Sequence, residues 1–84
     1  GKYYGLLIEL KVGNNKPSAE QTEFLINQNL CGYCAVVCYG HQETIEVIEK
    51  YLGGKDLSKN VRGLEKWALK YGLNNEWKNL LNCI

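Results

Sequence analysis

Apolar residues alternate with other residues near the start of the chain, and this pattern predicts a β-strand over residues 3–12. The even positions from 4 to 10 are all apolar, and Gly5 and Leu7 keep the start of the other face uncharged. Such a strand is typical of one buried on two sides. Residues 33–39 form a second, almost wholly apolar run, which predicts a short central strand.

Helical patterns follow both predicted strands. Ser18 and Gln21 have the spacing of a capping box, so we expect a helix from there to about residue 30, ended by Gly32. A second helix is predicted over residues 42–52, and two shorter ones over 59–71 and 75–82. The side chains spaced to face inward are Thr22, Leu25, Ile26 and Asn29 in the first helix, Ile45, Ile48 and Leu52 in the second, and Val61, Leu64, Ala68 and Tyr71 in the third.

The resulting order, β-α-β-α followed by one or two C-terminal helices, predicts an α/β fold. Its strands should be parallel, because a crossover helix joins strands that run in the same direction. Two strands are too few for a stable sheet. We therefore expect further pairing partners, either in a longer parent protein or in a second chain.

Composition narrows the class of protein. The 84 residues are 45% apolar and 23% charged, which is typical of one small globular domain. A formal net charge of +1 excludes binding driven by a strongly basic surface, although a local basic patch remains possible. No apolar run reaches the roughly 18–20 residues that cross a bilayer, and no signal peptide opens the chain, so we expect a cytoplasmic protein.

The four cysteines, Cys31, Cys34, Cys38 and Cys83, leave three possibilities open: disulfides, a metal site, or free thiols. If residues 33–39 are a strand, Cys34 and Cys38 lie about 13 Å apart, at ~3.3 Å per residue. That separation is too large for two ligands of one metal ion. The pattern favours free and mostly buried thiols.

Candidate chemistry begins at Glu9 and Lys11. These side chains share one face of the first strand, at its C-terminal end, where α/β sheets commonly place their sites. A carboxylate there can bind a hard cation such as Mg²⁺, and a neighbouring lysine can act on water or phosphate. The alternative is an ordinary ion pair at a solvated strand end.

The triplet Glu9-Leu10-Lys11, the Gly/Asn/Lys/Pro loop after it, Ser18-x-x-Gln21 and the run 31–40 occur in an order that resembles the VRR-NUC (virus-type replication-repair nuclease) family of PD-(D/E)xK nucleases. The resemblance covers roughly residues 3–52. It implies a partial restriction-endonuclease-like core at 1–52, with residues 53–84 as a helical extension packed on the same domain.

This resemblance implies a DNA endonuclease dependent on Mg²⁺ or Mn²⁺, which hydrolyses phosphodiesters in DNA repair or phage replication. It implies that Glu9 and the Leu10 carbonyl bind the metal, that Lys11 assists the attacking water, and that Gln21 points into the same site. The alternative role of Gln21 is purely structural: its side chain can accept a hydrogen bond from the Ser18 backbone N–H and complete the capping box. One amide, we reason, cannot serve both roles fully.

One departure from the family pattern is serious. The family has an aspartate on the preceding strand, whereas the sole aspartate here, Asp56, follows the second predicted helix. We therefore expect the chain to carry only part of an active site. A homodimer, or a complementary chain or segment, would supply the missing acidic ligand.

Two classes of function stay open: this nuclease, acting on branched or duplex DNA, and a non-catalytic α/β module that binds nucleic acid or a protein. Lys16, in the loop beside the triplet, is the best candidate for a phosphate contact. Arg62, Lys66 and Lys70 form an i, i+4, i+8 row that suits either a DNA backbone or, as we favour, a solvated helix face.

Overall fold

The computed structural model describes residues 3–73. Its elements, in chain order, are β1 (Leu6–Lys11), α1 (Ala19–Leu30), β2 (Cys34–Tyr39), α2 (Gly40–Leu52), α3 (Ser58–Arg62) and α4 (Leu64–Lys70). The predicted β-α-β-α order is confirmed. The helix predicted over 59–71 is instead two short helices separated by Gly63, and the helix predicted over 75–82 lies outside the described residues.

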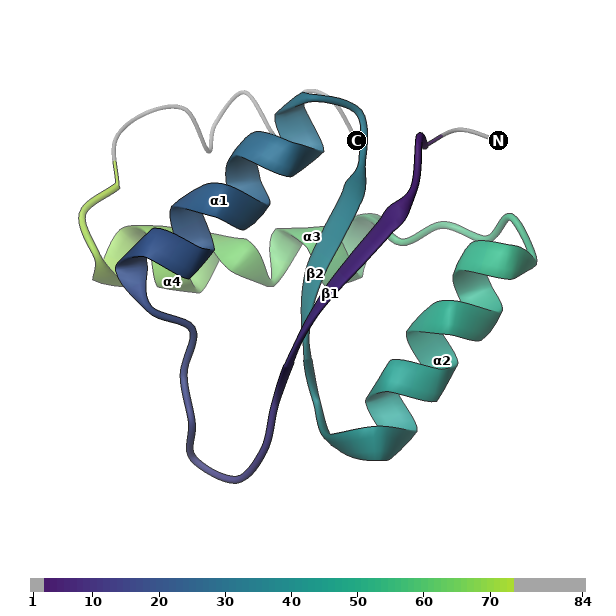
Figure 1. Ribbon diagram of the computed structural model, residues 1–84, viewed down its shortest axis with the longest axis horizontal. Helices are drawn as coiled ribbons and strands as arrows, with labels where there is room; N and C mark the ends of the chain where they lie inside the picture. The colour runs from purple at the N-terminus through teal and green to yellow at the C-terminus, as the bar shows by residue number, and fades with distance from the viewer. Residues whose placement is uncertain (1–2, 74–84) are drawn as a thin grey trace.

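The two strands pair in parallel, with Glu9 opposite Val37 and Lys11 opposite Tyr39. Figure 1 shows α1 and α2 on opposite sides of the strands, with α3 and α4 behind them. Helix α3 packs on β2, and α4 packs on α1. The molecule is therefore flat, measuring 34 × 30 × 16 Å along its principal axes.

The core gathers around β2. Cys34, Ala35, Val36 and Cys38 are fully buried, and the core continues into α3 and α4 through Val61 and Leu64. Strand β1 is shorter than predicted and only partly buried, so the expected burial on two sides is wrong. The reason is that no other strand within residues 3–73 pairs with its outer edge.

Helix α1 follows its sequence closely. Ser18 caps its first turn, and the buried residues are the predicted four: Thr22, Leu25, Ile26 and Asn29. The buried Asn29 amide bonds to both the N–H and the carbonyl of Ala35, and also to the Leu25 carbonyl. A buried amide with these partners costs little, and it fixes the end of α1 to β2.

Helix α2 buries a different stripe from the predicted one. Ile45, Ile48 and Leu52 are exposed, and Val47 is the buried residue. The correct stripe is one residue, or about 100°, away and includes Tyr51, which stacks on Tyr3. Helix α2 follows β2 without a loop, so the chain path at Gly40, with a φ of 80°, sets which side faces the sheet.

None of the helices in the described part of the chain is long and apolar enough to cross a membrane.

Candidate functional site

Glu9 and Lys11 stand side by side at the C-terminal end of β1. The Lys11 ammonium lies 3.1 Å from Glu9 Oε1, so the two side chains form an ion pair. The Lys11 side chain is only 18% exposed and that of Glu9 32%, which is a low exposure for charged groups. The prediction that Glu9 and Lys11 share one face of β1 is therefore confirmed. The ion pair considered as the alternative to a catalytic site is also present.

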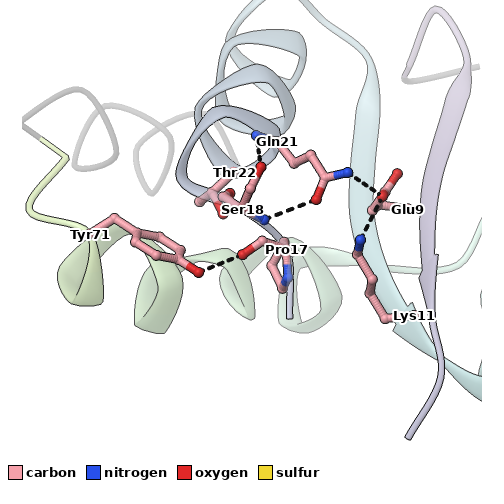
Figure 2. Close-up of polar contacts among 7 residues, drawn as sticks. All are labelled: Glu9, Lys11, Pro17, Ser18, Gln21, Thr22 and Tyr71. Carbon is pink, nitrogen blue, oxygen red and sulfur yellow. Dashed lines mark hydrogen bonds and ion pairs between the residues drawn. The ribbon is translucent and has the colours of Figure 1, made fainter. Parts of the chain in front are cut away.

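Gln21 joins these two residues from the first turn of α1. Its Nε2 donates a hydrogen bond to Glu9 Oε1 over 2.9 Å, as Figure 2 shows. Its Oε1 accepts from the Ser18 N–H over 2.9 Å, while the Gln21 N–H donates to Ser18 Oγ over 3.0 Å. The expectation that one amide could not serve both partners is wrong, because its oxygen serves the cap and its nitrogen serves the carboxylate.

The capping box has a consequence for the site. Since the Ser18 N–H requires an acceptor, the amide oxygen of Gln21 must face it, and the amide nitrogen must then face Glu9. The local signal that starts α1 thereby orients a donor toward the carboxylate. Both donors, from Gln21 and Lys11, meet on the same oxygen, Oε1 of Glu9, and within residues 3–73 no hydrogen bond occupies Oε2.

The peptide groups of β1 alternate in direction. The Cys34 N–H donates to the Gly5 carbonyl over 2.8 Å, which sets the phase of the parallel ladder. In such a ladder alternate residues of a strand direct their N–H and C=O groups at the partner strand. The peptide groups that point toward β2 are thus those of Gly5, Leu7, Glu9 and Lys11. The carbonyl of Leu10 points to the outer edge of β1, away from β2.

A cavity of about 300 Å³ lies between β1 and α1, next to this cluster. Its polar wall consists of Glu9, Glu20 and Gln21, and its apolar wall includes Leu7 and Phe24. Glu20 was not singled out from the sequence. Its place beside Gln21 in the first turn of α1 is the signal that could have pointed to it.

The donor atoms at this site suit a hard cation in type but not in number. The Glu9 carboxylate and the Leu10 carbonyl are oxygen donors, which Mg²⁺ and Mn²⁺ prefer. Residues 3–73 contain no group of three or more His, Cys, Asp or Glu side chains that could hold a metal. Asp56 is used elsewhere, accepting hydrogen bonds from the N–H and hydroxyl of Ser58 at the start of α3.

Lys16 does not join this cluster. Its side chain lies near that of Lys70, at the end of α4. The Lys16 ammonium lowers the pKa of Lys70, first by donating a hydrogen bond that favours the neutral amine and then through charge repulsion. The hydroxyl of Tyr71 donates to the Pro17 carbonyl over 2.6 Å and holds this loop against the end of α4. The helical row that includes Lys66 and Lys70 therefore lies next to Lys16, the predicted phosphate contact. The sequence did not reveal this proximity.

The cysteines of the strand belong to the core. Cys34 and Cys38 are fully buried on β2, and burial raises the pKa of Cys34 to about 11. Burial, and then the charge of Glu43, also raise the pKa of Cys38. Cys31 is an exposed free thiol, and Cys83 lies outside the described residues.

Scans of protein-family models, curated proteins and solved structures find no match for this chain.

Proposed function

We propose that this chain carries part of the active site of a DNA endonuclease dependent on Mg²⁺ or Mn²⁺, of the VRR-NUC type. The observation that supports this most is the chain of contacts Gln21–Glu9–Lys11 at the C-terminal end of a strand in a parallel β-α-β unit. The family resemblance assigns a role in the site to each of these three residues. An accidental ion pair would not require the amide of Gln21 as a third member.

The chemistry divides among few groups. Glu9, through its carboxylate, and Leu10, through its outward carbonyl, would hold the metal, which supplies positive charge to the phosphate and to the attacking water. The Gln21 amide keeps the Glu9 carboxylate in place. The Lys11 ammonium is a fixed donor beside the carboxylate, where it can orient a water molecule or stabilise charge that develops on a phosphate oxygen.

A second acidic ligand must come from outside the Glu9 cluster. The outer edge of β1 is unpaired by any strand within residues 3–73, and an open edge is a template for a further strand. In this proposal a second copy of the chain, or a complementary chain or segment, pairs there and brings a carboxylate next to Glu9. Free, buried thiols such as Cys34 suit a reducing, cytoplasmic setting in a bacterial or phage-infected cell.

Metal binding and cleavage test the proposal together. Once the missing acidic ligand is supplied, Mn²⁺ titrated into the protein should bind, with free Mn²⁺ followed by electron paramagnetic resonance, and the Glu9→Gln substitution should abolish this binding. The matched control is Glu46→Gln, a similar change on the exposed surface of α2. With the missing acidic ligand supplied, Glu9→Gln or Lys11→Ala should lower DNA cleavage at least ~100-fold, the size of losing a key electrostatic contributor. Full activity of Glu9→Gln would remove Glu9 from the site.

The second candidate is a non-catalytic module that binds nucleic acid or a protein. It is favoured by the single carboxylate of the cluster, whose charge Lys11 already balances. If Mn²⁺ does not bind even when the further ligand is supplied, but DNA still does, the module is correct and the nuclease is not.

A further inference from the structure

Two lysine side chains from distant parts of the chain meet beside the loop that leads into α1. Lys16 lies in this loop, and Lys70 lies in the last turn of α4. The Lys16 side chain is close enough to that of Lys70 to lower its pKa, through a hydrogen bond to the neutral amine and through charge repulsion. Both side chains are exposed to solvent. A contact between two cations is unfavourable, and an anion that bridges them would relieve the repulsion.

The backbone holds this pair in place. Each lysine directly precedes an anchored residue: Pro17 is fully buried, and the hydroxyl of Tyr71 donates to its carbonyl over 2.6 Å (Figure 2). The hydrogen bond joins the loop to the end of α4. The meeting of Lys16 and Lys70 thus follows from how the chain is packed.

Among the described residues, no carboxylate forms an ion pair with these lysines. Between residues of the described range, 3–73, the only ion pair is that of Glu9 and Lys11. A third ammonium group lies close by, because Lys66 and Lys70 both stand over the ring of Trp67, at 4.8 and 5.7 Å from its centroid. The result is a surface of three lysines that form no ion pair with any residue of the part of the chain that the structure describes.

We propose that Lys16 and Lys70, with Lys66 beside them, bind the phosphate backbone of the DNA that reaches the Glu9–Lys11 site. The proposal rests on the proposed function in taking DNA as the ligand. A phosphate group has several oxygens that can accept from two ammonium groups at once. One loop joins Lys11 to Lys16, so we expect one DNA strand to contact both places.

The surroundings favour contact with the backbone over contact with bases. The ring of Trp67 is largely buried beneath the two lysines, so it is not available to stack on a base. Ammonium groups that neutralise phosphates carry no sequence preference. The lysine surface should therefore add affinity equally for DNA of any sequence.

Fluorescence anisotropy with labelled duplex DNA tests this, using the 84-residue chain in EDTA so that no cleavage occurs. Affinity is measured over a series of KCl concentrations for Lys16→Gln, Lys70→Gln and the double variant. Affinity falls as salt rises, and each single substitution should make this fall of log affinity with log salt less steep, by about one in the slope. The change should be the same for two unrelated sequences. The double variant should lose no more slope than either single one, because both lysines hold one phosphate.

The matched control is Lys55→Gln, the same change at an exposed lysine in the loop after α2. An unchanged slope in Lys16→Gln and Lys70→Gln, an equal loss in Lys55→Gln, or no DNA binding at all would overturn the proposal. The proposal would also be overturned if the Lys16 and Lys70 variants bound a polyglutamate peptide more weakly but bound DNA as well as the wild type. That result would assign the lysine surface to an acidic protein.

The outcome is separable from that of the proposed function. Mn²⁺ binding tests Glu9, whereas the salt slope in EDTA tests Lys16 and Lys70, so the two measurements can fail independently. If Mn²⁺ binding fails but the Lys16 and Lys70 effects hold, the lysine surface stands and the nuclease does not.

Discussion

The side of the molecule built from α1, α4 and β2 is the more closed one, with Phe24 and Leu69 as its exposed large apolar residues, whereas the open side, built from β1 and α2, leaves more apolar side chains at the surface. On the closed side, α1 buries its predicted stripe and satisfies even the amide of Asn29. On the open side, the most apolar stripe of α2, Ile45, Ile48 and Leu52, faces outward, and Leu10 and Val12 of the adjoining strand end are exposed.

This difference indicates that a further protein segment would pack on the open side. Exposed apolar side chains beside an unpaired strand edge are typical of an interface. The proposed site lies at the same edge, because the carbonyl of Leu10 points outward from β1. In our proposal, the chain that covers the open side also completes the site.

The largest expected difference between the two sides is in stability. Leu64→Ala, at a residue 1% exposed in the closed core, should lower the free energy of unfolding by about 2–5 kcal/mol, because it leaves a cavity. Leu52→Ala, at a residue 78% exposed on α2, should change it by at most about 0.5 kcal/mol in dilute monomer. Urea unfolding followed by circular dichroism measures both. A similar loss in the two variants would mean that the open side is already covered.

Self-association should respond to the open side alone. At micromolar concentration, light scattering of the wild type should report a dimer, and Ile48→Glu should shift it to the 9.6 kDa monomer, because a buried carboxylate opposes an apolar contact. Leu69→Glu, an equivalent change at an exposed residue of α4, is the control and should leave the dimer intact. A wild type that is a well-folded monomer would contradict the predicted homodimer and leave a complementary chain as the partner.

The smallest expected effect is a dependence on pH from the closed core. Since the pKa of Cys34 is raised to about 11, the folded state keeps its thiol proton at a pH where the unfolded chain, with a pKa of ~8.5, has lost it. Stability from this group is therefore complete below about pH 8.5 and falls as the pH rises toward 11. Cys34→Ala should flatten that slope in urea unfolding measured from pH 8 to 10.5.

Reactivity provides a check on the same assignment. With a thiol reagent at pH 8, Cys31 on the surface should react quickly and Cys34 only on unfolding. Rapid modification of Cys34 in the folded protein would show that β2 is less enclosed than the core packing indicates.

The sequence by itself determined the features that depend on near neighbours in the chain. The capping box of Ser18 and Gln21 spans three residues, and it fixed both the start of α1 and the orientation of the Gln21 amide. The alternation along β1 placed Glu9 and Lys11 on one face. These outcomes need only backbone geometry and hydrogen bonds within one turn or one strand.

Tertiary structure decided what depends on how elements pack. Two stripes of α2 are apolar enough to face inward, and the direct passage from β2 through Gly40 selected the less apolar one. The contact of Gln21 with Glu9 joins α1 to β1, and the meeting of Lys16 with Lys70 joins a loop to the far end of the described chain. No local pattern encodes these contacts, because each depends on the relative placement of segments that only the packed core brings together.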